Sequence, residues 1–191
     1  MALIVVGGQS KHVGKTTLVC EIIRHFVSAR WTAAKITSHF HEPQECTPVA
    51  SGSGWTLWEQ SASDSQMDTA RYLEAGAMRS LLVSAESESL SSACAALKAE
   101  VSENENAIVE STAGAELLAP DLFLLVVNPG SGEIKDSAGE QLARAHALLV
   151  SAEAHTSGAV GYPEHIRTFS RVRSGIDVRL AKMIDELLRK T

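Results

Sequence analysis

The sequence has little of what marks several large classes of protein. Its three cysteines, Cys20, Cys46 and Cys94, form no Cys-x2-Cys pair, so neither a disulfide framework nor a zinc ribbon is indicated. No apolar run approaches the roughly 20 residues that a bilayer-spanning helix requires, and no charged segment precedes the first apolar run. We therefore expect a cytoplasmic protein without a membrane partner. The 17 basic residues against 23 acidic ones give a net charge of −6, which argues against a nucleic-acid-binding surface.

What the chain does have is an alternation of apolar runs with helical patterns. This alternation predicts an α/β fold, a three-layer, doubly wound and mostly parallel sheet. A length of 191 residues fits one domain, 1–191, interrupted at about 38–67 by a long segment rich in Ser, Gly, Pro and Gln. We expect that segment to be a loop insertion. The predicted strands are 2–6, 32–37, 80–84, 107–110, 122–128, 147–151 and 158–162, and the predicted helices are 16–29, 69–75, 90–102, 137–145 and 177–189.

The sequence predicts a phosphate-binding loop at residues 7–17, between the first predicted strand and the first predicted helix. In this arrangement successive backbone N–H groups surround phosphate oxygens at the positive end of the helix. Lys15 would then reach the β- and γ-phosphates of a nucleotide, and the Thr16 hydroxyl would hold Mg²⁺. The expected nucleotide-binding residues of the loop are Gly8, Gln9, Ser10, Lys11, His12, Val13, Gly14, Lys15, Thr16 and Thr17.

The spacing of this loop is Gly-x5-Gly-Lys-Thr, because Gln9 stands where the strict consensus has glycine. It resembles the subclass of P-loop NTPases that includes dethiobiotin synthetase, the nitrogenase iron protein and the molybdopterin-guanine dinucleotide biosynthesis protein B family. In several of these proteins a second loop lysine contacts phosphate. The resemblance implies that role for Lys11, which lies one residue closer to Lys15 than in the usual form.

Two charged residues near predicted strand ends, Lys35 and Glu110, are further candidates for the ligand-binding site. Ligands of open α/β sheets bind beyond the carboxyl ends of the strands. An ammonium in a buried strand is costly unless it reaches water or an anion, so Lys35 is a catalytic candidate beside Lys11 and Lys15. The alternative is a lysine that extends to solvent at a sheet edge.

Glu110 ends a buried strand, at the position where P-loop enzymes place the acid near Mg²⁺, so we assign Thr16 and Glu110 to the metal. The alternative for Glu110 is a structural carboxylate.

The candidate substrate-binding residues are His39, His41, Asp68 and Arg71. The two histidines alternate on an extended segment, and with Cys46 they also make a metal site conceivable. Asp68 and Arg71 bring opposite charges to a predicted helix start, where an N-cap role for Asp68 is the structural alternative.

The order of these residues resembles the molybdopterin-guanine dinucleotide biosynthesis protein B family over about the first two-thirds of the chain. The matching positions are Lys35, His39, His41, Asp68, Thr69, Arg71, Ala75, Gly76, Ala77 and Glu110. The resemblance implies Mg²⁺, GTP and an adaptor role in molybdenum-cofactor maturation. The chain departs from the family after Glu110, where Ser111 and Thr112 replace the usual glycine, and in its Ser/Gly-rich segment 51–65.

Base preference and function stay open at this level. Asn128, at the end of the fifth predicted strand, is placed to contact a purine, and this leaves ATP and GTP as alternatives. The first hypothesis is Mg²⁺-dependent binding and slow hydrolysis of a nucleoside triphosphate. The others are an ATP-dependent enzyme that phosphorylates or ligates a small molecule, like dethiobiotin synthetase, and a nucleotide-sensing scaffold without hydrolysis. The second partner is an unidentified small molecule or protein, and a homodimer is among the alternatives.

Overall fold

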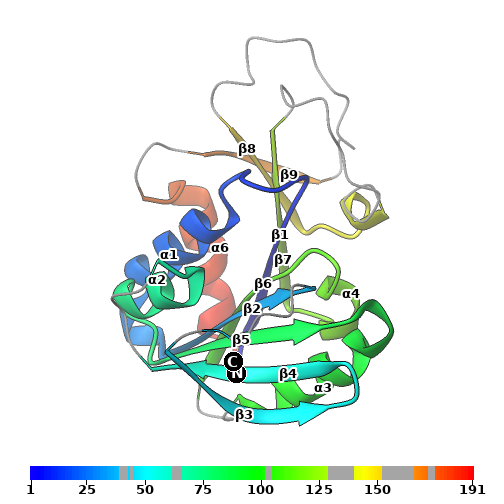
Figure 1. Ribbon diagram of the computed structural model, residues 1–191. Coiled ribbons are helices and arrows are strands. Elements are labelled where there is room, and N and C mark those ends of the chain that lie inside the picture. The colour runs from blue at the N-terminus through cyan, green and yellow to red at the C-terminus, as the bar shows by residue number, and fades with distance from the viewer. Residues whose placement is uncertain are drawn as a thin grey trace.

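A mixed, mostly parallel β-sheet runs through the molecule (Figure 1). The structure, a computed structural model, describes residues 1–38, 43, 45–61, 66–101, 105–128, 140–151, 166–171 and 175–191. Within these residues nine strands are joined in the order β3-β4-β5-β2-β6-β1-β7-β8-β9. They are β1 (Leu3–Gly8), β2 (Trp31–Thr37), β3 (Cys46–Gly52), β4 (Trp55–Gln60), β5 (Arg79–Ala85), β6 (Asn106–Glu110), β7 (Leu122–Val127), β8 (Ala147–Ser151) and β9 (Arg167–Arg171).

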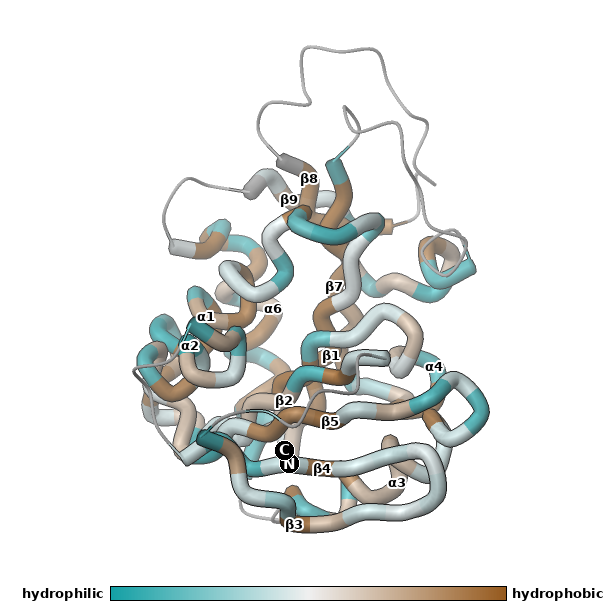
Figure 2. Tube along the Cα trace, viewed as in Figure 1, coloured by the Kyte–Doolittle hydropathy of each residue, from teal (hydrophilic) through white to brown (hydrophobic). Residues whose placement is uncertain are grey.

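Helices cover both faces of the sheet. Helices α1, α2 and α6 pack on one face, and α3 and α4 pack on the other (Figure 1). Figure 2 shows the apolar character of the central strands, and every residue of β1 and β7 is buried. The bounds are α1 (Lys15–His25), α2 (Asp68–Glu74), α3 (Leu90–Glu100), α4 (Ala115–Leu118) and α6 (Val178–Leu188), with 3-10 turns η1 (Val27–Ala29) and η2 (Ser87–Ser89).

The predicted fold class is confirmed, and six of the predicted strands appear within a few residues of their expected ends. The first helix is shorter than predicted, because the backbone leaves the helical region at Phe26, where φ is −115°. The predicted strand 158–162 and part of the predicted helix 137–145 lie outside the described residues. None of the helices in the described segments has the length and apolar character needed to cross a bilayer.

The prediction of a loop throughout 38–67 is wrong for residues 46–60. These residues form the antiparallel strands β3 and β4, which extend the sheet beyond β5. Gly54, with φ of 72°, lies in the turn between them, and Leu57 is fully buried against the core beside α3. The Ser/Gly-rich composition thus reflects an exposed edge strand and a tight turn. Segments 39–42 and 62–65 lie outside the described residues.

Strand β1 lies between β6 and β7, and this position locates the site. The chain leaves β1 through α1 and reaches β2, which lies on the β6 side of β1 within the sheet. It later passes from β6 across β1 to β7, which lies on the opposite side of β1. Ligands of doubly wound sheets bind at such a reversal, beyond the carboxyl ends of the strands. The carboxyl end of β1 is the start of the phosphate-binding loop.

Candidate functional site

The predicted phosphate-binding loop connects β1 to α1 through two residues in the left-handed region. His12 has φ of 61°, and Gly14, directly before α1, has φ of 93°. A residue without Cβ adopts this conformation at low cost, which explains glycine at position 14. The Gly14 carbonyl accepts the first helical hydrogen bond, from the Leu18 N–H at 3.1 Å. The turn thereby directs the beginning of α1 at the space above β1.

Side chains anchor this loop to the two strands that flank β1. The Thr112 hydroxyl, just beyond β6, accepts a hydrogen bond from the Gly8 N–H at 2.9 Å and lies 3.2 Å from the Gly8 carbonyl. On the β7 side, the Gln9 N–H donates to the Val126 carbonyl, and the Gln9 amide oxygen accepts from the Asn128 N–H, each at 2.9 Å. Gln9 is buried, so its side chain serves as a tether.

The loop borders a cavity of about 820 Å³. Four cationic residues and two carboxylates line it, an excess of two positive charges in a chain whose net charge is −6. Such a local excess favours an anionic ligand despite the acidic whole. The charged lining residues are Lys11, Lys15, Lys35, Arg71, Asp68 and Glu110, and the loop and helix start contribute Gly8, Ser10, His12, Gly14, Thr16 and Thr17.

Most predicted loop residues therefore line the cavity, but two do not. Gln9 points back to β7, and Val13 packs against the apolar core beside α1. The Lys15 ammonium donates to the Ser10 carbonyl at 3.0 Å, across the mouth of the loop. Lys11 is exposed on the cavity wall.

Thr16 and Glu110, the two residues predicted for the metal, are in direct contact. The Thr16 hydroxyl donates to Glu110 Oε2 at 2.7 Å. Glu110 is 4% exposed, and the buried Tyr72 hydroxyl donates to the same oxygen at 2.6 Å. The Lys35 ammonium lies 3.4 Å from the other oxygen, Oε1. Hydroxyl and carboxylate oxygens are the donors that Mg²⁺ prefers, so this pair fits that ion.

Asp68, at the first turn of α2, forms an ion pair with Lys35, and Arg71 Nη1 lies 3.4 Å from its other oxygen. Burial opposes ionisation of Asp68, but the hydrogen bond and charge of Lys35 outweigh it and hold the Asp68 pKa below its usual value. Burial likewise disfavours the charged Lys35, yet Glu110 and Asp68 raise the pKa of its ammonium. The site therefore holds a fixed pattern of charges.

Tyr72 remains protonated for a related reason. Burial, reinforced by the neighbouring Glu110 carboxylate, raises the Tyr72 pKa well above its ordinary value. The phenol is therefore a permanent donor to Glu110.

The remaining sequence candidates are placed differently. His39 and His41 lie outside the described residues, so their substrate role stays a prediction. The Cys46 thiol donates to Gln60 Oε1 at 3.3 Å, and the described segments contain no group of three or more His, Cys, Asp and Glu that could hold a metal. Asn128 lies at the end of β7 but not among the residues lining the cavity. Asp68 is not the N-cap of α2, because Met67 occupies that position.

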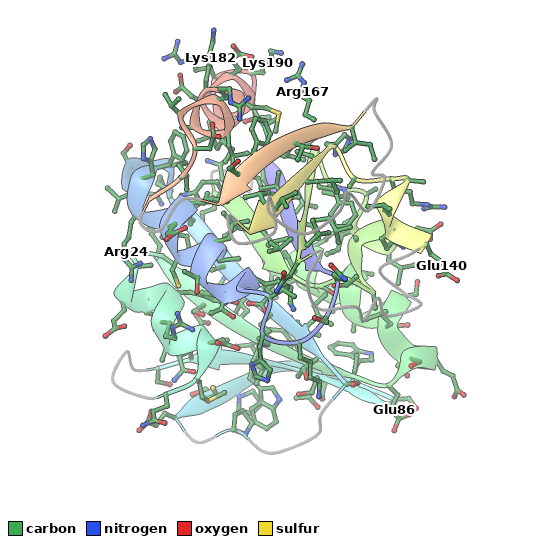
Figure 3. All side chains as sticks on the ribbon, turned by 90° about the horizontal axis from the view of Figure 1, so that it is seen from above. Arg24, Glu86, Glu140, Arg167, Lys182 and Lys190 are labelled. Atoms are coloured by element: carbon green, nitrogen blue, oxygen red, sulfur yellow. The ribbon has the colours of Figure 1, made fainter. Side chains whose placement is uncertain are left out.

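Two residues that support the site through hydrogen bonds, Tyr72 to Glu110 and Thr112 to Gly8, were not predicted. Tyr72 has the spacing of an ordinary core residue on α2, and only the tertiary structure brings its hydroxyl to β6. Thr112 belongs to the Ser-Thr pair that departs from the resembled family, and this departure was a usable signal. Figure 3 shows that other charged side chains, among them Lys182 and Lys190 on the α6 side, project outward from the molecule.

Comparison with protein-family models and with curated proteins finds no match. Solved structures do resemble this chain. LpxK from Aquifex aeolicus in complex with ATP aligns with 89% of this chain at 16% identity and a TM-score of 0.54. This chain spans about half of LpxK, 53% of its length.

Two further structures align over most of this chain. HypB from Helicobacter pylori in complex with nickel aligns with 99% of this chain and 88% of its own, at 14% identity and a TM-score of 0.55. A zinc-bound triple mutant of the YjiA GTPase aligns with 94% of this chain and 60% of its own, at 13% identity and a TM-score of 0.52. At these identities the comparisons show the fold alone, a mixed, mostly parallel α/β fold.

Proposed function

We propose that this chain binds a nucleoside triphosphate with Mg²⁺ in the cavity above β1 and hydrolyses it slowly. The observation that carries the proposal is the contact between the Thr16 hydroxyl and Glu110 Oε2, 2.7 Å apart, at the start of a helix that follows a left-handed glycine, Gly14. A phosphate site at the predicted phosphate-binding loop and an oxygen-donor site for a cation at Thr16 and Glu110 would lie side by side, as a Mg²⁺-nucleotide requires.

The roles of the residues follow from their contacts. The loop N–H groups and the α1 N-terminus would bind phosphate oxygens. The Lys15 ammonium would exchange its bond to the Ser10 carbonyl for a phosphate oxygen, a charge-assisted and therefore stronger bond. Thr16 would hold Mg²⁺ with Glu110 beside its water shell, and the ion would supply charge neutralisation at the phosphates. Lys11 and Lys35 would add positive charge where negative charge develops.

The two residues directly after Glu110 favour slow turnover. In many P-loop hydrolases a carboxamide or carboxylate near this point orients the attacking water. Here the Ser111 hydroxyl accepts from the Gly114 N–H at 2.9 Å, and the Thr112 hydroxyl is engaged with Gly8. Both hydroxyls therefore serve the backbone. The same observation is compatible with the nucleotide-sensing scaffold, in which hydrolysis is absent.

A second candidate function is phosphorylation or ligation of a small molecule. Its support is the size of the cavity, which continues past the loop to Ser38 at the end of β2 and to Ser87 and Leu90 at the start of α3. This part of the cavity would receive the acceptor. Addition of a small-molecule extract should then raise turnover strongly, whereas the first function predicts little change.

The finer role, as an adaptor in molybdenum-cofactor maturation, rests on the residue resemblance. Lys35, Asp68, Arg71 and Glu110, the matching residues within the described segments that carry charge, all line one cavity. His39 and His41, outside the described residues, are further proposed contacts of the substrate. A small molecule or a protein would be the second partner, and a homodimer is the alternative.

Isothermal calorimetry with ATP and GTP, with and without Mg²⁺, tests the proposal. Lys15→Ala should lower triphosphate affinity by about 10- to 150-fold, since a hydrogen bond to a charged group contributes about 1.5–3 kcal/mol. The exposed Lys182 on α6, which projects away from the molecule in Figure 3, offers the matched control Lys182→Ala. Equal affinity in the parent and Lys15→Ala would remove the basis of the proposal.

A further inference from the structure

The hydroxyl of Tyr72 is the most unusual polar group near the site. Tyr72 lies on α2, is fully buried, and packs in the apolar cluster between the sheet and helices α1 and α6. Phenylalanine would fill the same volume without a polar atom to desolvate. A buried hydroxyl costs free energy unless it finds a partner, and the partner here is Glu110 Oε2 at 2.6 Å.

The three described donors to the Glu110 carboxylate differ in what else they face. Thr16 and Lys35 both line the cavity, where a bound cation or anion would compete for them. Tyr72 does not line the cavity and has no exposed surface. Its bond to Glu110 is therefore the one among these three that a ligand in the cavity cannot reach.

We propose that Tyr72 is a positioning residue, which holds the Glu110 carboxylate in the orientation that receives Mg²⁺ or its bound water. This inference rests on the proposed function. The phenol donates to Oε2 of Glu110 from outside the cavity lining, and Thr16 donates to the same oxygen from the cavity lining. Partners that orient metal-associated groups in this way typically contribute 10- to 100-fold to metal affinity.

The bond has a second consequence, because it joins α2 to the end of β6. Helix α2 also carries Asp68 and Arg71, which line the cavity. The hydroxyl of Tyr72 thus keeps these residues and the metal-binding edge in one rigid group. A role limited to packing would need only the ring.

The test is Tyr72→Phe, which removes the hydroxyl and keeps the ring. Thr69→Val is the matched control, because Thr69 is also fully buried on α2 and its hydroxyl donates to Gln60 at 2.7 Å, away from Glu110. Two quantities are measured for each variant by calorimetry with a non-hydrolysable ATP or GTP analogue. The first is the nucleotide affinity in the presence of a chelator. The second is the Mg²⁺ concentration at which half of the Mg²⁺-dependent increase in nucleotide affinity is reached.

Tyr72→Phe should raise the half-saturating Mg²⁺ concentration about tenfold and change the metal-free affinity less than twofold. Thr69→Val should change neither quantity. If Thr69→Val shifts the Mg²⁺ titration as far as Tyr72→Phe, the effect is general loosening of α2 and the inference is wrong. A Tyr72→Phe titration equal to that of the parent also overturns it. A parent protein that binds no nucleotide with Mg²⁺ would instead overturn the proposed function, and the inference with it.

Discussion

Replacement of Gln9 tests how the phosphate-binding loop is held in place. Gln9 is 5% exposed, and its amide oxygen accepts from the Asn128 N–H at 2.9 Å. Gln9→Met keeps the length and removes the acceptor. The Asn128 N–H then loses its hydrogen bond to Gln9, but Asn128 is only partly buried, so water can replace part of that bond. We expect a loss of about 1 kcal/mol in the free energy of unfolding, the lower end of the range for a buried donor left without a partner.

Gln9→Gly restores the strict consensus of the motif and yet should be the worse variant. It loses the same hydrogen bond and adds the conformational freedom of glycine, about 0.5–1 kcal/mol, for a total of about 1.5–2 kcal/mol. The extra freedom is lost again when the loop orders around phosphate, so nucleotide affinity should fall about three- to fivefold. Gln9→Met should retain more of the affinity.

Urea denaturation measures the differences in the free energy of unfolding, provided that its dependence on urea concentration is the same in each variant. Calorimetry measures the nucleotide affinities. A Gln9→Gly variant as stable as the parent would refute the reasoning, because the tether to β7 would then contribute nothing. A Gln9→Met variant less stable than Gln9→Gly would also refute it, because packing rather than the amide oxygen would then dominate.

Two other substitutions probe the loop and the sheet edge. A Cβ at Gly8 would lie 2.7 Å from Val13 Cγ2 and 2.8 Å from Lys15 Cδ. Gly8→Ala should therefore displace Lys15, lower nucleotide affinity at least tenfold in calorimetry, and lower the free energy of unfolding by about 1–3 kcal/mol. Unchanged affinity would contradict this geometry. Glu59 pairs with Arg79 through two hydrogen bonds of 2.9 and 3.0 Å, and the bond from Arg79 lowers the Glu59 pKa. A lowered folded pKa stabilises above the unfolded value, about 4.3, and this stabilisation is lost as pH falls through the folded pKa. Glu59→Gln should therefore cost about 0.5–1 kcal/mol at pH 7 in urea titrations, and the cost should shrink as the pH falls below about 4. A cost that does not change with pH would show that packing is responsible.

The parts of the fold that are predictable from sequence are those buried on both faces. Strands β1 and β7 are continuous apolar runs because helices cover the sheet on both sides, so composition alone locates them. Strand β3 is an edge strand with mostly exposed residues and a proline, Pro48, at a register shift. Its composition is that of a loop, and only pairing with β4 makes it a strand.

The candidate site divides in a similar way. Local backbone geometry, which a contiguous motif encodes, brings Gly14, Lys15 and Thr16 to the cavity. The position of Glu110 at the cavity was predictable from its place at a strand end. Tyr72 acts through a hydrogen bond across 38 residues of sequence, and no local pattern distinguishes it from a core aromatic residue.

The position of β1 in the middle of the sheet also bears on the order of folding. Leu3 pairs with Ala107 and Ile4 with Leu122, and the Gly8–Thr112 hydrogen bond spans 104 residues. The predicted phosphate-binding loop is therefore synthesised well before the strands β6 and β7 that flank it. Contacts of such long range slow folding. At about 5–20 residues per second, roughly 6–24 s of translation separate the synthesis of Gly8 from that of Val127, the last residue of β7. A nascent chain should consequently become competent to bind nucleotide only late, and nucleotide would then act on an assembled sheet rather than as a template for its folding.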